Sequence, residues 1–172
     1  KEIVAFGAHR EGWPPMIKDE YDLLCYCIIT SATLREAIER TRSFLQMLGE
    51  RGAIVKLEIE NDMAEFQLFT HHRKRDSIAM FGDLTGLSAH YRLFSWLVDL
   101  PLNLVEVKMF YPQLINNNVA LFFIPFPITY NTKINAFRFP SHFLDKPIIR
   151  SPEQLKRLLI RFPFDVEDTR GP

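Results

Sequence analysis

The sequence has no excess of charge of either sign. Its 172 residues include 21 lysines and arginines and 21 aspartates and glutamates, which gives a formal net charge of +0. A protein that binds nucleic acid by itself usually carries a basic excess, because much of its affinity comes from neutralising phosphates. We therefore expect no DNA binding by this chain alone, and we place any DNA contact in a region outside it.

Cysteine and long apolar runs are also scarce. The two cysteines, Cys25 and Cys27, lie in one apolar segment, which is not the spacing of a disulfide framework and favours a reducing compartment. No stretch reaches the roughly 18 apolar residues of a membrane span, and no secretion signal opens the chain. These absences predict a cytoplasmic protein without a membrane partner. Because the chain begins at Lys1 and stops at Pro172, we expect it to be part of a longer protein.

Sequence signatures of catalysis and of cofactor binding are missing. Gly82 and Gly86 have the wrong spacing for a phosphate loop, and Ser88 lacks the context of a nucleophile elbow. No HExxH or paired CxxC motif is present. We predict no metal, no cofactor and no enzymatic activity. Catalytic residues meet in space and not in sequence, so a small Cys- or His-dependent enzyme stays as an alternative hypothesis.

Two local groups of reactive side chains allow alternative interpretations. The thiols of Cys25 and Cys27 would point to different sides of a helix, so inert thiols are favoured over a shared metal. The run His71–Asp76 combines two histidines with three cations. A metal site or a nucleic-acid contact competes there with a solvated basic connector, which we favour because connecting segments are usually polar and exposed.

The first third of the chain contains a clear amphipathic helix over residues 34–48. Thr33 and Glu36 have the spacing of a capping box at its start, and apolar residues recur at helical intervals until a glycine. The apolar segment 21–30 can form a buried helix or a strand, and its length favours the helix. Residues 1–20 are interpreted as a short strand or loop, because two consecutive prolines break regular structure.

The rest of the chain alternates strands and helices. Residues 55–59 and 64–68 alternate apolar with polar side chains around a turn at Asn61-Asp62, which predicts a β-hairpin. Residues 77–99 predict a second long helix. The later segments are a strand at 104–111, a short helix at 117–124, strand pieces at 128–130 and 136–139, and a last helix from Pro152. This order predicts a single α+β domain over 1–172, with a mainly antiparallel sheet and helices packed on it.

Aromatic residues are plentiful, with 15 phenylalanines, 5 tyrosines and 2 tryptophans. Core packing explains most single rings. A pocket lined by several rings and a few polar groups, however, suits a small organic ligand. Because rings are dense where the helix at 77–99 must meet the sheet, we predict a small-molecule cavity there. The candidate lining residues are Phe66, Tyr91, Phe94 and Trp96.

Several segments, taken in order, resemble one family of regulatory domains. Residues 21–40, YDLLCYCIITSATLREAIER, are similar to an apolar helix followed by the pattern S/T-x-T-L-x-E-A-L. Residues 90–112, HYRLFSWLVDLPLNLVEVKMFYP, are similar to a helix and a strand that ends near a proline. Shorter resemblances follow in the family's order at 127–130, 135–139, 144–147 and 153–163. The family is the arabinose-binding-type N-terminal domain of AraC/XylS transcriptional regulators, and the resemblance covers about residues 20–166.

The resemblance implies a bacterial regulator whose sensor domain binds a small-molecule effector and commonly forms a homodimer. DNA would be bound by a C-terminal helix-turn-helix domain, which this chain lacks. The sequence departs from the family's pattern at Asn116-Asn117-Asn118, where a more varied polar stretch is usual, and at Ile124-Pro125, where a glycine turn is commoner. The family shares no universal ligand residues, so none is carried over, and arabinose is not implied.

The sensor hypothesis has a rival in a dimeric interaction domain with a fully packed interior and no effector, and a ligand-sized cavity would distinguish the two. Self-association has its own rival, in which segments outside this chain carry the dimer contacts and leave it monomeric. We expect a two-fold interface on the outer side of the helix at 34–48 or on the helix at 77–99, because edge strands risk open-ended pairing. Such an interface should bury on the order of 1,000 Å² or more.

Overall fold

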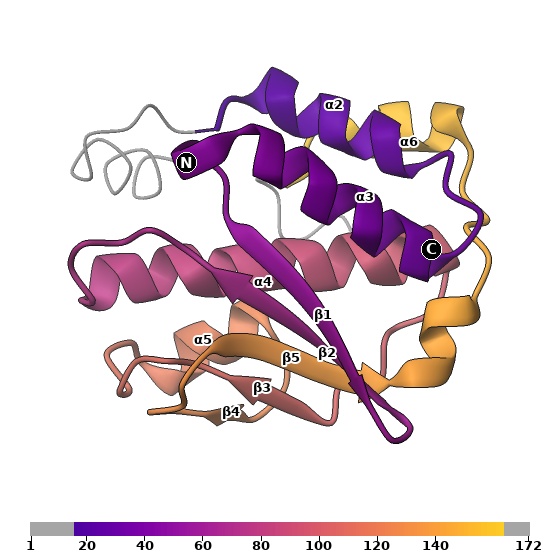
Figure 1. Cartoon of the computed structure of the whole chain (residues 1–172). Helices are drawn as coiled ribbons and strands as arrows, with labels where there is room; N and C mark the ends of the chain where they lie inside the picture. The colour runs from indigo at the N-terminus through magenta and orange to yellow at the C-terminus, as the bar shows by residue number, and fades with distance from the viewer. Residues whose placement is uncertain (1–15, 164–172) are drawn as a thin grey trace.

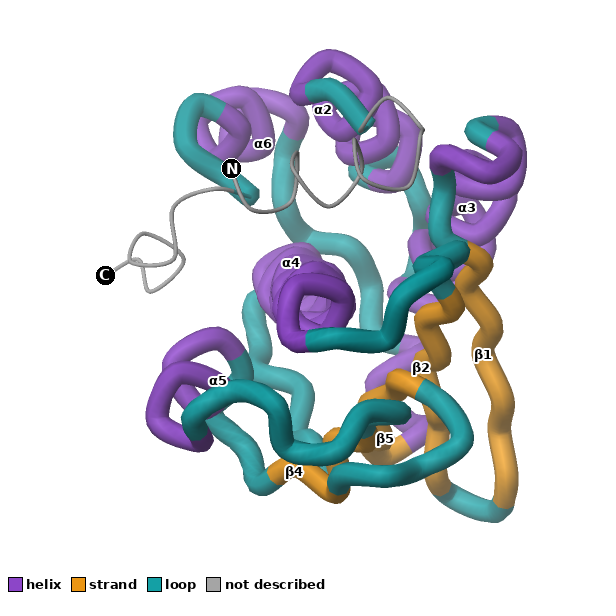
Figure 2. The backbone as a smooth tube through the Cα atoms, turned by 90° about the vertical axis from the view of Figure 1, so that its left-hand side faces the viewer, coloured by secondary structure: helices purple, strands orange, loops and turns teal. Residues whose placement is uncertain are grey.

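A 22-residue helix, α4 (Ser77–Val98), runs through the middle of the protein (Figures 1 and 2). The computed structural model describes residues 16–163. The buried residues of α4 are spread over more than half of its circumference, so this helix must be enclosed on most sides. Asp76 caps its start by accepting a hydrogen bond from the Ala79 N–H at 3.1 Å. Asp99 ends it in the left-handed conformation, with φ of 55°.

Three helices lie above α4 in Figure 2: α2 (Lys18–Ile28), α3 (Leu34–Met47) and α6 (Pro152–Leu159). The capping box predicted at the start of α3 is only partly formed. The Thr33 hydroxyl accepts a hydrogen bond from the Glu36 N–H at 3.4 Å, but the Glu36 carboxylate accepts from the N–H of Ala32 instead of that of Thr33. Two short 3₁₀ helices, η1 (Gly49–Arg51) and η2 (Ser141–Asp145), complete the connections.

A five-stranded sheet covers the other side of α4 in the order β1-β2-β5-β3-β4. The strands are β1 (Ile54–Glu60), β2 (Met63–Phe69), β3 (Glu106–Lys108), β4 (Ile128–Thr129) and β5 (Asn135–Pro140). All pairs are antiparallel except β3–β4, which is parallel. The short helix α5 (Asn117–Phe123) lies beside the β4 end of the sheet (Figure 2). The predicted α+β fold with a mainly antiparallel sheet is therefore confirmed.

Most predicted elements are present, with two differences. The segment 21–30 is helical, and α2 already begins at Lys18, within the segment expected to be irregular. The expectation for residues 1–15 lies outside the described residues. The strand expected at 104–111 is confined to Glu106–Lys108, because the Phe110 N–H is bound by the Asn135 side chain and not by a strand. Among residues 16–163, no helix is both long and apolar enough to cross a membrane.

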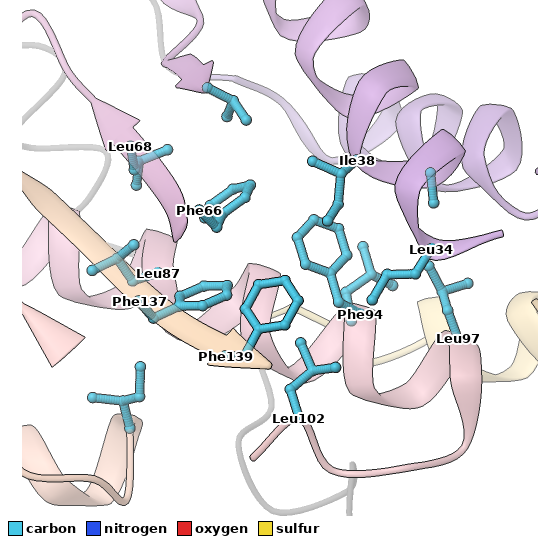
Figure 3. Close-up of a cluster of buried hydrophobic side chains, with 14 of the residues drawn as sticks. Leu34, Ile38, Phe66, Leu68, Leu87, Phe94, Leu97, Leu102, Phe137 and Phe139 are labelled. Carbon is cyan, nitrogen blue, oxygen red and sulfur yellow. The ribbon is translucent and has the colours of Figure 1, made fainter. Parts of the chain in front are cut away.

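Aromatic rings fill the space between α4 and the sheet (Figure 3). The fully buried ring of Phe66 is stacked on Phe137, with centroids 4.9 Å apart, and meets Phe94 edge-on at 5.3 Å. His90 lies against the same rings, and its Nδ1 is 2.7 Å from the Gly86 carbonyl oxygen. Burial lowers the pKa of His90, so its imidazole is neutral at neutral pH.

The junction between η1 and β1 requires glycine at position 52. A Cβ atom there would lie 2.2 Å from the carbonyl oxygen of Leu45, which is fixed in the last turn of α3. By contrast, a Cβ at Gly82 in α4 would meet nothing closer than the His72 ring, at 3.7 Å. An alanine substitution at Gly82 is therefore a control for the same substitution at Gly52.

We expect G52A to lower the free energy of unfolding by about 1–3 kcal/mol, because the end of α3 must move. G82A should leave it unchanged or raise it by up to about 1 kcal/mol, because alanine favours the helix. Urea denaturation followed by circular dichroism measures both. Equal stability of G52A and the wild type would contradict the close approach described for Leu45.

Candidate functional site

A groove of about 440 Å³ lies between the C-terminal half of α4 and α5. This volume falls within the range of small-molecule sites. Its lining consists of Tyr91, Arg92, Ser95, Trp96, Asp99, Leu100, Pro101, Leu121, Phe122, Phe123, Pro125 and Arg150. We call this the α4–α5 groove. Helix periodicity explains the contribution of α4, because Arg92, Trp96 and Asp99 are four and three residues apart and share one face.

Arg150 lines the groove and anchors the end of α4. Its Nε donates a hydrogen bond to the Trp96 carbonyl oxygen at 2.9 Å, and its guanidinium carbon lies 5.2 Å from the centre of the Trp96 ring. Its Nη2 forms an ion pair with Asp99. Because the last carbonyls of a helix lack helical partners, this cation also stabilises the C-terminus of α4.

Arg92 supplies a second cation on the same face of α4. Its Nη2 donates to the Pro163 carbonyl oxygen at 3.3 Å, and its guanidinium carbon lies 5.1 Å from the centre of the buried Phe162 ring. Among the described residues that line the α4–α5 groove, Asp99 is the one carboxylate beside two arginines, so these residues carry a formal charge of +1. Such a groove attracts an anion.

Two large apolar residues of the groove are exposed to solvent and not packed into the core. The Phe122 side chain is 54% exposed and Leu100 is 43% exposed, although both are apolar. The Tyr91 ring packs edge-on against the Phe126 ring, with the two ring centroids 5.5 Å apart. Exposed rings beside fixed cations are typical of a surface that binds an organic molecule and not only water.

The four residues proposed from the sequence fall on two sides of α4. Tyr91 and Trp96 line the α4–α5 groove. Phe66 and Phe94 lie in the packed core, where they fill the space in which a cavity is predicted from the sequence. Sequence reasoning missed Arg92, Phe122 and Arg150. Arg92 was detectable, since it is four residues before Trp96 on a helix, whereas Arg150 is distant in the sequence.

A second groove of about 470 Å³ lies where the end of α3 meets β1. Its lining is Arg42, Leu45, Gln46, Gly49, Glu50, Ala53, Ile54, Val55, Lys56 and His71. Among its described lining residues there is no tyrosine, phenylalanine or tryptophan, and the imidazole of His71 is the one flat ring that it offers to an organic ligand. The α4–α5 groove is therefore the better candidate site.

The carboxylate of Asp83, on α4, is completely buried and collects donors from several segments. Its Oδ1 accepts from the Thr70 hydroxyl at 2.7 Å, and its Oδ2 accepts from the Tyr111 hydroxyl at 2.5 Å and from the Asn135 amide at 2.8 Å. Burial and the adjacent carboxylate raise the pKa of Tyr111, so its phenol stays protonated and donates. We call these four residues the Asp83 cluster.

The basic run His71–Asp76 is more than a solvated connector, because two of its side chains approach the Asp83 cluster. His72 Nε2 lies 3.2 Å from Asp83 Oδ1, and Arg75 Nη1 lies 3.7 Å from Asp83 Oδ2. No group of three or more histidine, cysteine, aspartate or glutamate side chains within residues 16–163 is arranged to hold a metal ion. The run therefore supports the fold through a buried carboxylate.

The thiol of Cys25 is not activated. Cys25 is buried in α2, and burial raises its pKa to about 12, so its thiol is protonated at neutral pH. Cys27 is exposed. Neither thiol lines one of the two grooves, and the half-buried imidazole of His90 does not either.

We expect D83N to destabilise the protein by about 2–4 kcal/mol, because the amide cannot accept all the hydrogen bonds that the buried carboxylate accepts. D145N is the control, since the Asp145 side chain is 76% exposed and faces only Arg35, at 3.4 Å. Its effect should stay within about 0.5 kcal/mol. Urea titration of both variants tests this, and equal effects would refute the structural role given to Asp83.

Comparison with known families matches residues 15–148 to the model of the arabinose-binding domain of the AraC transcription regulator, its N-terminal domain. Among solved structures, the crystal structure of transcriptional regulator CdpR from Pseudomonas aeruginosa is similar, with a TM-score of 0.56 at 16% sequence identity. The similarity covers 92% of this chain and 49% of that one, so the chain spans about half the length of that regulator. At this identity the likeness shows the fold alone. No curated protein matches the chain.

Proposed function

Because the chain belongs to the family of the arabinose-binding N-terminal domain of AraC transcription regulators, we propose that it senses a small organic effector in the α4–α5 groove. The effector binds one arrangement of the domain better than another and thereby shifts the placement of a DNA-binding domain outside this chain. The regulator acts in the cytoplasm, pairs with a second copy of itself, and contacts DNA only through that other domain.

One observation carries the choice of site: a fixed guanidinium and an exposed aromatic ring face the same groove. Arg150 is held against Trp96 by a hydrogen bond and by stacking, and the Phe122 ring lies exposed in the same lining. A guanidinium binds a carboxylate through two parallel hydrogen bonds, and rings bind an apolar body. The groove thus suits an organic acid with an apolar or aromatic body.

The charge of the groove supports a monoanion. Arg92 and Arg150 outnumber Asp99 by one charge, and the other described residues of the lining are uncharged. A single carboxylate would neutralise this net charge, while a neutral sugar would leave it in place. The family's name therefore does not make arabinose the expected ligand.

A route from the groove to the C-terminal part of the domain supports a regulatory role. Arg150 directly precedes Ser151, the N-cap of α6, and Arg92 contacts Phe162 and Pro163 just after α6. Both cations of the groove are therefore attached to the segment 150–163. An anion that binds either guanidinium competes with the contacts that hold this segment. The effector would then bind two arrangements of the segment with different affinity, which is what regulation requires.

The two rival functions, an interaction domain without effector and a small enzyme, fit the groove and the cysteines less well. A purely structural interaction domain would cover the α4–α5 groove with protein, so it would show no preference among small molecules. A cysteine-dependent enzyme needs an activated thiol, and the raised pKa of the buried Cys25 gives the opposite. Sensing fits the open, cationic and aromatic groove better than either rival.

We expect small apolar carboxylates to bind and their neutral amides not to bind. Suitable matched pairs are phenylacetate with phenylacetamide, indole-3-acetate with indole-3-acetamide, and octanoate with octanamide. At saturation a binding acid should raise the melting temperature by about 3–8 °C. Thermal-shift screening followed by calorimetry measures this. Amides that bind as well as the acids would remove the role given to the arginines.

For any acid that binds, F122A should weaken affinity by about tenfold, because a large apolar contact is lost. V119A is the matched control: Val119 lies on the same helix and is 42% exposed, but does not line the groove. Its affinity should be that of the wild type. Equal loss in both variants, or loss in neither, would show that the ligand binds elsewhere.

A further inference from the structure

The strand β1 forms an open edge of the sheet. It pairs with β2 on one side only, and Figure 2 shows it at the outer border of the sheet. Over its 7 residues, alternate backbone N–H and C=O groups point away from β2, and such an edge is a template for another strand. Two of its large apolar residues, Ile54 and Ile59, are each 48% exposed. This edge is a surface suited to protein contact.

The charges on β1 are not balanced within the sheet. Glu58 lies directly opposite Glu65 of β2, and Lys56 lies opposite the uncharged Gln67. Glu65 already has its own cation, because Lys108 donates to it at 2.7 Å. Within the described part of the chain, neither Lys56 nor Glu58 takes part in an ion pair. One face of the edge therefore carries the cation Lys56 and the anions Glu58 and Glu60, each two residues from the next. Lys56 Nζ lies 5.2 Å from the centre of the Phe69 ring and, like Glu58, is exposed to a partner.

We propose that two copies of this chain pair through β1, antiparallel, about a two-fold axis at Leu57. This inference rests on the self-pairing included in the proposed function and assigns its interface. The axis sets Leu57 opposite the second copy's Leu57. It sets Lys56 opposite the second copy's Glu58, and by symmetry Glu58 opposite the second copy's Lys56. Opposite charges in directly opposed pairs stabilise an antiparallel sheet.

The other registers of the β1–β1 pairing oppose like charges or overlap less. A two-fold axis normal to the sheet keeps matching faces together only if it passes through a residue. Centred on Lys56 it opposes two lysines, and centred on Glu58 it opposes two glutamates. Centred on Ile59 it sets Glu58 against Glu60. Centres nearer to the strand ends shorten the overlap, so the Leu57 register combines a long overlap with complementary charge.

This interface closes and does not propagate. The two-fold axis uses the β1 edge of both copies, and the edge left at the other end of the sheet, β4, is only two residues long. The helix faces expected from the sequence are less suited to the contact. Most of α4 is enclosed, and the outer side of α3 is occupied by ion pairs between Arg40 and Glu36 and between Arg42 and Glu39.

Charge reversal tests the register without touching the core. Both Lys56 and Glu58 are exposed, so neither reversal should affect folding. K56E and E58K each create two pairs of like charges, and each should weaken self-association by about tenfold. The double variant K56E/E58K restores opposite charges and should recover the wild-type dimer. Sedimentation velocity over a micromolar to submillimolar range measures all four proteins.

A cross-link tests the position of the axis. In a C27S background, L57C should form an intermolecular disulfide under mild oxidation, because the facing Cα atoms lie within disulfide range only at the axis. I59C, four residues from its symmetry mate, should not. A wild-type dimer that is unaffected by K56E and by E58K overturns this interface but leaves dimerisation in place. A wild-type monomer at all concentrations overturns the interface together with the self-pairing of the proposed function.

Discussion

The burial of α4 is the constraint around which the rest of the fold is arranged. A helix that is apolar around most of its circumference cannot face water on more than a narrow side. The sheet encloses it from below, while α2, α3 and α6 lie above it (Figure 2). The α4–α5 groove forms where this enclosure is incomplete, near the C-terminal end of α4. The candidate site is therefore a direct consequence of how the central helix is covered.

Locally encoded features were predictable from the sequence, and features that depend on distant contacts were not. The β1–β2 hairpin follows from alternation around Asn61, whose positive φ of 53° suits the turn. The strand after α4 was overestimated, because the side chain of Asn135, far along the chain, binds the Phe110 N–H. No local pattern in the sequence contains that contact.

The same distinction explains the candidate site. Since α4 is apolar on most sides, periodicity alone could not tell that Phe94 faces the sheet while Tyr91 and Trp96 face the groove. Arg150 comes from a segment with no sequence link to α4, and it arrives there because its guanidinium satisfies the carbonyl of Trp96. Likewise, the basic run before α4 gave no hint that His72 approaches a buried carboxylate.

The shortness of α6 has a mechanical consequence. A helix of eight residues is not stable by itself, so its folding depends on the packing of Leu155, Leu159 and Phe162 against the core. Detachment and unwinding are then a single event. Unwinding would lengthen this stretch by about 14 Å, the difference between helical and extended rise over its residues. The contacts of Arg150 just before α6 and of Arg92 just after it favour the shorter, helical form of this stretch.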